Sequence, residues 1–166
     1  MPRKPRLQAL RTNHDHDRCI EDALAAAVTR CRASGARLTP LRRRVLEILW
    51  QSHKPLGAYA ILDVLAGEGR RAMPPTVYRA LDFLQAQGLV HRIPSLNAYL
   101  GCGDPGAHRG AQYLICRACG TVAELADSGV ESRLSASARA QGFRVEHILS
   151  EAVGLCPGCA ARGSAA

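Results

Sequence analysis

The sequence contains no run of about 18 apolar residues, so it offers no candidate for a membrane-spanning helix. Its basic start, MPRKPRLQALR, lacks the apolar stretch of a secretory signal, and we therefore expect a cytoplasmic protein. Internal repeats and long low-complexity segments are absent as well. An apolar content of 47% in 166 residues is enough for one ordinary domain or two small ones.

Acidic residues are scarce in the first hundred positions, which hold 16 Lys and Arg against 8 Asp and Glu. Residues 101–166 hold six of each sign, so the whole formal net charge of +8 comes from the N-terminal part. The basic residues are densest between residues 30 and 54. This asymmetry predicts a polyanionic partner for the first part of the chain, with a solvated charged face as the ordinary alternative.

The N-terminal part predicts four helices and a hairpin. Residues 1–16 are polar and contain proline, so we expect a mobile basic arm there, with a first helix from Asp17. Thr39 is a natural N-cap for a second helix, with Pro40 at its first position. AYAILDVLAGEG and MPPTVYRALDFLQAQG predict two more helices, and LVHRIPSLNAYLG predicts two short strands. This order indicates a winged helix-turn-helix domain that binds DNA, over residues 17–100.

The fourth predicted helix would be the recognition helix. Its apolar positions follow the spacing i, i+3, i+4, i+7 and are Val77, Ala80, Leu81 and Leu84. Thr76, Tyr78 and Arg79 are then left outside, where such a helix meets bases and phosphates, unless this is an ordinary polar face. Tyr78 could contact a phosphate or a thymine methyl, and Arg79 a phosphate or a guanine. Arg37, in the basic stretch, is a further candidate for DNA contact.

Residues 112–166 predict a small α/β domain after a glycine-rich hinge at residues 101–111. QYLIC and TVAEL are typical of strands, GVESRLSASARAQG of a helix, and FRVEHILSEAVGLC of a longer strand. The fold class that we expect is therefore α+β, a winged-helix domain followed by a small α/β domain.

Two C-x-x-C pairs give the strongest chemical signal. They are separated by 36 residues, more than the spacing of about 15–20 in a simple zinc ribbon, so a strand-helix-strand unit must lie between them. An odd total of seven cysteines suits thiolate ligation in a reducing compartment better than disulfides. We expect a closed four-sulfur structural zinc site, with a redox dithiol or unmetallated thiols as alternatives. Its ligands are Cys116, Cys119, Cys156 and Cys159.

A second set of donors is scattered over the wing, the hinge and the second domain. Singly, a strand histidine is usually a surface residue and a lone cysteine a small core residue. Together they offer two imidazoles, one thiolate and one carboxylate, a complement that suits four-coordinate Zn²⁺. The set consists of His91, Cys102, His108 and Glu124.

Four segments, RLTPLRRRVLEIL, PPTVYRALDFLQAQGLVHRI, CRACG and GLCPGC, resemble in order and spacing the ferric uptake regulator (Fur) family of metal-sensing repressors. The match runs from about Cys31 to Cys159. Within the family the chain is most similar to the zinc uptake regulators (Zur), whose regulatory zinc ligands match His91, Cys102, His108 and Glu124. Iron-sensing relatives carry a histidine-rich stretch where this chain has GCGDPGAHRG.

The resemblance implies a homodimer that binds an A·T-rich palindromic operator when metal is present and represses genes for zinc uptake. It implies that residues 112–166 form the dimerisation domain with structural zinc. About two Zn²⁺ per protomer, one structural and one regulatory, would follow from the two ligand sets. Some members place two dimers on one operator, and Asp63 and Arg79 resemble the pair that joins them.

Other function classes are less well supported by the residues. A zinc hydrolase or deaminase could use Cys, His and Glu to activate water, but a four-cysteine site has no open position. The chain also lacks the H-x-E and P-C-x-x-C arrangement, so we expect neither enzymatic activity nor a small-molecule substrate. A family member that senses iron or peroxide, or a constitutive DNA-binding protein with structural zinc only, remains the alternative.

Overall fold

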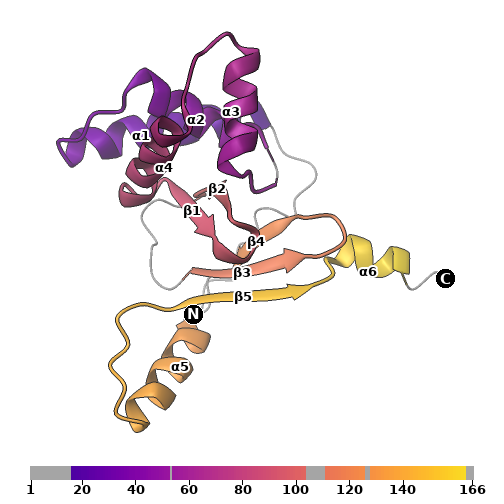
Figure 1. The fold of residues 1–166 in the computed structure, drawn as a ribbon. Coiled ribbons are helices and arrows are strands. Elements are labelled where there is room, and N and C mark those ends of the chain that lie inside the picture. The colour runs from indigo at the N-terminus through magenta and orange to yellow at the C-terminus, as the bar shows by residue number, and fades with distance from the viewer. Residues whose placement is uncertain (1–15, 53, 104–110, 126–127, 164–166) are drawn as a thin grey trace. The chain divides into compact units, whose positions relative to one another are not determined.

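The computed structural model describes residues 16–52, 54–103, 111–125 and 128–163 (Figure 1). These residues form two compact units, one represented by residues 16–103 and the other by residues 111–163. None of the helices in these ranges is both long and apolar enough to cross a membrane. Most of the expected arm and hinge, with His108, lies outside the described residues, and the domain limits given above stay predictions.

The first unit has the expected order of four helices and a hairpin (Figure 1). Strands β1 and β2 are antiparallel, with His91 opposite Leu100. The prediction of an α+β fold with an N-terminal winged helix is confirmed. The elements are α1 (His16–Ala33), α2 (Pro40–Gln51), α3 (Ala58–Gly67), α4 (Pro74–Ala86), β1 (Val90–Ile93), a 3-10 helix (Pro94–Leu96) and β2 (Ala98–Gly101).

Local chemistry explains where these elements start and stop. The Thr39 hydroxyl accepts a hydrogen bond from the Arg42 N–H at 3.4 Å, and Pro40 opens α2 without losing a needed donor. After α4 the chain turns at Gly88, whose φ of +65° is a conformation that other residues rarely adopt. Inside the hairpin, Asn97 takes a similar left-handed conformation at φ 45°.

The core of the first unit lies where the helical periodicity predicts it. All four apolar positions of the α4 stripe are buried, and α2 and α3 pack their own apolar faces against them. Two of the three arginines of α2 contact side chains outside that helix. Arg42 stacks over the Phe83 ring at 3.5 Å from its centroid, and Arg44 forms ion pairs with Glu47 and Glu68. Their long side chains thus cover neighbouring helices.

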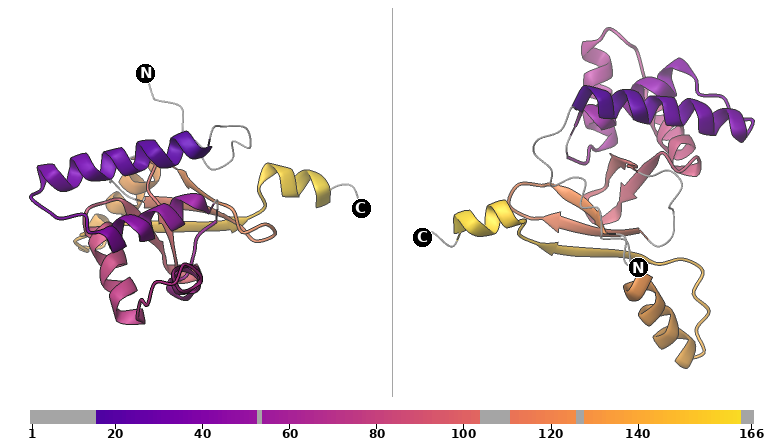
Figure 2. Two further views of the ribbon diagram at one scale, coloured as in Figure 1. Left: turned by 90° about the horizontal axis from the view of Figure 1, so that it is seen from above. Right: turned by 180° about the vertical axis from the view of Figure 1, so that it is seen from behind.

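The second unit is a three-stranded sheet with two helices. The strand order is β4-β3-β5, with β3 antiparallel to β4 and parallel to β5. The helices α5 and α6 lie beyond opposite ends of this sheet (Figure 2). The elements are β3 (Ala111–Cys116), β4 (Val122–Leu125), α5 (Ser128–Ala140), β5 (Leu149–Gly154) and α6 (Pro157–Gly163).

Two features of the second unit differ from the sequence-based expectation. The last strand begins at Leu149, which pairs with Ala111 of β3, and not at Phe143. His147, expected in a strand, therefore lies in an exposed irregular segment. The helix α6 was not predicted, since seven residues with a proline and two glycines carry no helical periodicity.

Candidate metal centres and nucleic-acid interface

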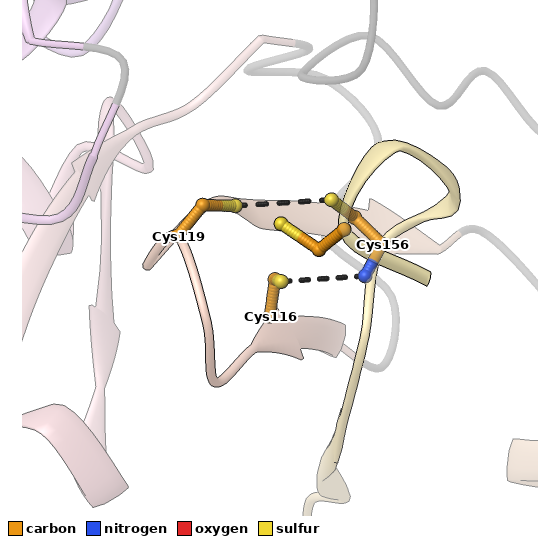
Figure 3. A group of neighbouring side chains, drawn as sticks. Cys116, Cys119 and Cys156 are labelled. Atoms are coloured by element: carbon orange, nitrogen blue, oxygen red, sulfur yellow. Dashed lines mark hydrogen bonds between the residues drawn. The ribbon is translucent and has the colours of Figure 1, made fainter. Parts of the chain in front are cut away.

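The four cysteines of the C-x-x-C pairs lie together in the second unit. Cys116 ends β3, Cys119 follows in the turn before β4, Cys156 precedes α6, and Cys159 lies within α6. Their four sulfur atoms all lie within 4.8 Å of one another. Figure 3 shows the side chains of Cys116, Cys119 and Cys156 pointing toward a common centre.

Hydrogen bonds favour thiolates in this cluster. The backbone N–H of Cys156 donates to Cys116 Sγ at 3.3 Å (Figure 3), and this bond is the main reason that the pKa of Cys116 is lowered to about 6. Cys119 Sγ forms a 3.2 Å hydrogen bond with the Thr121 hydroxyl, which lowers the pKa of Cys119. Two of the four sulfurs are thereby prepared for metal binding near neutral pH.

The fourth sulfur shows why the cluster needs a cation. The Arg162 guanidinium donates to Cys159 Sγ at 3.2 Å and lowers its pKa, but the neighbouring Cys156 sulfur and burial outweigh this, and the pKa of Cys159 is raised to about 11. Four adjacent sulfurs resist ionising together unless a positive ion lies between them. Four thiolates in a closed set are the donors that structural Zn²⁺ takes, so the residues fit this metal.

Two residues around the four-cysteine cluster were missed by sequence reasoning. Thr121 gave no signal, because its hydroxyl reaches Cys119 only through the shape of the turn. Arg162 lies three positions after Cys159 on α6, a spacing that places two side chains on the same helix face. Predicting α6 as a helix would therefore have indicated that Arg162 lies beside Cys159.

A second pair of donors lies at the base of the wing. One ring nitrogen of His91, in β1, and the sulfur of Cys102, just after β2, lie within 4.8 Å of each other. The backbone N–H of Cys102 donates to Leu89 O at 2.9 Å, and Leu89 directly follows the turn that ends α4. An imidazole and a thiol thus lie together near the C-terminal end of α4, and this donor pair is suited to Zn²⁺.

The other two predicted regulatory ligands are placed differently. His108 lies outside the described residues. Glu124 belongs to the second unit, where it stands in β4 opposite Tyr113 of β3. Its side chain is partly buried. The assignment of these two residues to a common metal with His91 and Cys102 therefore stays a prediction.

The remaining cysteines have ordinary positions in α1. Cys31 is buried in the core of the first unit, and burial raises the pKa of its thiol. Cys19 is half-buried. All seven cysteines lie in the described part of the chain, and none of them forms a disulfide bond there. The cysteines outside the two donor groups therefore have structural surroundings typical of small apolar residues.

The candidate DNA-binding residues are mostly on the surface. Thr76 and Arg79 are exposed on the first turns of α4, and Arg37 is exposed before α2. Tyr78 is a partial exception, because it is half-buried and packs against the core. Successive helix positions differ by about 100°, which leaves residue 78 at the border of the apolar stripe. Asp63, of the predicted dimer-dimer pair, is exposed on α3.

An exposed arginine on the wing was not among the predicted contacts. Arg92 follows His91 in β1, and side chains of successive strand residues point to opposite faces. Its guanidinium donates to Asn97 Oδ1 at 3.3 Å. The sequence could have indicated Arg92, because it directly follows the wing histidine. Side chains alternate along a strand, so a basic residue at this position lies on the face opposite the metal donor.

Comparisons with known proteins agree on one family. The model of the ferric uptake regulator family matches residues 33–152. The chain is 41% identical to the zinc uptake regulation protein of Escherichia coli (strain K12), over 84% of this chain and 82% of that protein. It is 33% identical to the ferric uptake regulation protein of Legionella pneumophila, over 76% of this chain and 93% of that protein.

Solved structures give the same result. A zinc uptake regulator complexed with zinc and DNA is similar with a TM-score of 0.83 and 38% identity, covering 87% of this chain and 97% of that one. The crystal structure of holo XcZur is similar with a TM-score of 0.78 and 41% identity, covering 84% of this chain and 98% of that one.

Proposed function

The chain belongs to the ferric uptake regulator family, and from this premise we propose that it is a zinc-responsive transcriptional repressor. It binds operator DNA as a zinc-loaded homodimer and represses genes for zinc uptake. One observation carries the proposal: His91 and Cys102, two zinc-type donors, lie together at the base of the wing beside the recognition helix. The similarity to proteins named for zinc uptake regulation supports it.

Two zinc ions per protomer serve different purposes in this proposal. The four-cysteine site holds a structural zinc that joins the turn after β3 to the segment around α6. For a unit this small, metal binding worth roughly 10–16 kcal/mol in zinc-finger peptides decides whether the fold forms. The second zinc is regulatory. Thiolate and imidazole donors, together with the Irving–Williams order, favour Zn²⁺ over Fe²⁺ and Mn²⁺ there.

The regulatory site takes two further ligands in the proposal. The sequence match to the zinc uptake regulators adds His108, in the hinge, and Glu124, in β4. The bound ion would then connect donors of the DNA-binding part with a donor of the dimerisation part. Without it, a glycine-rich hinge allows many orientations, and few of these fit two recognition helices into successive major grooves. Zinc selects the population that binds DNA.

The magnitudes are compatible with this switch. Moving a two-state population from about 1:99 to 99:1 needs roughly 5.5 kcal/mol of differential affinity. Typical couplings between two sites are about 1–3 kcal/mol, so one site supplies only part of this free energy, and the two sites of a dimer together reach it at the upper end of the range. Because linkage is reciprocal, operator DNA must also tighten zinc binding by the same factor.

The DNA contacts come from the exposed part of the first unit. Thr76 and Arg79 of α4 face the bases and phosphates of the major groove, with the edge of Tyr78 beside them. Arg37 and the wing residue Arg92 add phosphate contacts. The excess of basic residues in this unit strengthens the attraction to DNA at low salt.

The apolar surface of the second unit supports the proposed homodimer. Large apolar side chains are exposed on α5, on β5 and beside them, and Val153 alone is 64% exposed. Such a surface is costly in water unless another surface covers it. The resemblance to the family implies that the same unit of a second copy of the chain covers this surface. The residues are Val130, Leu134, Phe143, Leu149, Val153 and Leu155.

Two dimers can share one operator in the proposal. Asp63 on α3 and Arg79 on α4 are both exposed and carry opposite charges, as a pair between neighbouring dimers requires. An ion pair of this kind sets the spacing of the dimers more than their affinity.

The proposal is tested by a metal titration of operator binding. An A·T-rich palindromic duplex is first selected from random DNA with the zinc-loaded protein. Binding of the purified chain to this duplex is then measured at fixed salt while free Zn²⁺, Fe²⁺ or Mn²⁺ is varied. We expect zinc to induce binding at the lowest free concentration of the three, with a second equivalent of zinc per chain required. Induction by iron alone would favour an iron sensor, and binding that ignores the second equivalent would favour a constitutive DNA-binding protein.

A further inference from the structure

The single tryptophan of the chain packs against the glycine that precedes Cys102. Trp50 lies near the end of α2, and Gly101 is the last residue of β2. A Cβ atom added to Gly101 would lie 2.6 Å from Trp50 Nε1 and 2.9 Å from both Cδ1 and Cε2. These distances are far below normal contact and involve a rigid ring. Only glycine leaves room for the indole at this position.

The indole has little freedom to move away. Trp50 is partly buried and packs against the core of the first unit. On the glycine side of the contact, β2 is held by two backbone hydrogen bonds between Leu56 and Tyr99, at 2.8 and 2.9 Å, and by its pairing with β1. The next anchored atom along the chain is the Cys102 N–H, bonded to Leu89 O. The contact with the indole therefore lies within a short segment whose backbone is fixed on both sides.

We propose that the contact between Trp50 and Gly101 positions the Cys102 thiolate for the regulatory zinc and links that site to helix α2. The inference rests on the proposed function, in which Cys102 is a ligand of this zinc. A zinc–thiolate bond has a length of about 2.3 Å and a tetrahedral direction, so small displacements of the sulfur weaken it. Trp50 and Gly101 do not touch the metal and are positioning residues.

The direct test is the variant Gly101→Ala in the full-length chain. Its methyl group must displace either the indole or the end of β2, and with it Cys102. We expect the second zinc to bind between about 10-fold and 100-fold more weakly, the range found when residues that orient metal ligands are changed. The first, structural zinc should stay bound. Affinities are measured by competition with a chelator of known zinc affinity, and the geometry of the site by the visible spectrum of bound Co²⁺.

A rescue variant separates positioning from a general loss of fold. In Trp50→Leu with Gly101→Ala, the smaller side chain makes room for the new methyl group, so the second zinc should regain most of its affinity. Gly67→Ala is the matched control, because no atom lies within 4 Å of its added Cβ and its φ is ordinary. It should leave both zinc sites unchanged. If Gly101→Ala does not fold, Trp50→Leu alone should still weaken the second zinc, because it removes the support behind Gly101.

The outcomes distinguish this inference from the proposed function. Wild-type affinity for the second zinc in Gly101→Ala would overturn the inference and leave the proposed function intact. The same holds if the double variant binds the second zinc as weakly as the single one, because the indole would then not be the cause. A wild-type chain that binds only one zinc would overturn the proposed function, and the inference with it.

Discussion

At the scale of single residues, the surroundings of a cysteine decide its chemistry. Cys116 accepts a backbone N–H, and its pKa is lowered to about 6, so it is largely a thiolate near neutral pH. Cys31 is enclosed by apolar side chains, and burial raises the pKa of its thiol. The first is therefore prepared for a metal and the second serves as a small core residue.

A serine at position 119 should remove the structural zinc. Cys119→Ser deletes one of the four donors that lie within 4.8 Å of one another, and the remaining three cannot close a tetrahedral site. We expect loss of one zinc per chain and of the unfolding transition of the second unit, because metal binding and folding are coupled. Zinc content by atomic emission and thermal unfolding by circular dichroism test this. Cys19→Ser is the control, and a normal melting profile with two zinc ions in Cys119→Ser would refute the assignment.

Residue patterns predict some of these sites and not others. The two C-x-x-C turns are local, so their spacing alone predicts a shared metal. His91 and Cys102 each have an ordinary interpretation singly, and a shared metal is indicated only by their combined donor chemistry and by the resemblance to a family. The contact between Trp50 and Gly101 joins positions 51 apart in a core whose packing no local pattern encodes, so it could not be predicted.

At the scale of elements, an ion-pair network joins α2 to α3. Arg44 donates to both carboxylate oxygens of Glu68 at 2.5–3.0 Å and to Glu47 at 3.0 Å. The hydrogen bond from Arg44 lowers the pKa of Glu68 below its ordinary value of 4.5. Arg44 is therefore engaged within the unit and is a poorer candidate for phosphate contact than Arg37 or Arg79.

The pH dependence of the first unit should reveal this pair. Since the pKa of Glu68 is lower in the folded state, its stabilising effect is present above pH 4.5 and is lost as the pH falls through the folded pKa. Glu68→Gln should thus lower the urea midpoint at pH 7, and this difference should shrink at about pH 3. Unfolding is followed by the fluorescence of Trp50, which reports on this unit. Glu21→Gln, at an exposed position of α1, is the control, and an equal effect of Glu68→Gln at both pH values would contradict the prediction.

Elements differ in how well the sequence predicts them. Capping and periodicity are local, and α2 and α4 begin where Thr39, Pro40 and the proline pair before Thr76 predict. The start of β5 depends on pairing with β3, which is remote in the sequence: its first residue, Leu149, pairs with Ala111. The short α6 is formed next to the cysteine cluster, where Cys159 N–H bonds back to Cys156 O, and has little helical pattern of its own.

At the scale of the whole molecule, a charged residue on the apolar surface of the second unit should separate the dimer. Val153 is 64% exposed on β5, and an aspartate there would be buried without a partner in a dimer. We expect Val153→Asp to sediment as a single chain, to keep its structural zinc and to bind the palindromic operator at least about tenfold more weakly, since half of the contacts are lost. Val64→Asp, at an exposed valine of α3, is the control. A dimeric Val153→Asp would show that this surface is not the interface.

The chain combines two tasks that no single element performs. The first unit supplies a basic surface and the pair His91 and Cys102, and the second supplies the four-cysteine site and the apolar surface. In our proposal, operator binding depends on zinc because one ion connects ligands from both parts. The charge distribution and the order of the motifs predict this division of tasks between the two units. The strength of the coupling between zinc binding and DNA binding depends on the orientations that the hinge allows.

The most direct measurement compares zinc-dependent operator binding by Cys102→Ser and Cys19→Ser. Both variants replace one cysteine of the first unit, and Cys102 is the one whose sulfur lies within 4.8 Å of a ring nitrogen of His91. Fluorescence anisotropy of a labelled operator duplex is followed while free zinc is raised at constant salt. The account predicts that Cys19→Ser responds to zinc like the wild type, whereas Cys102→Ser keeps its structural zinc and stays unresponsive. An unchanged zinc response in Cys102→Ser would contradict the claim that a metal at this position controls DNA binding.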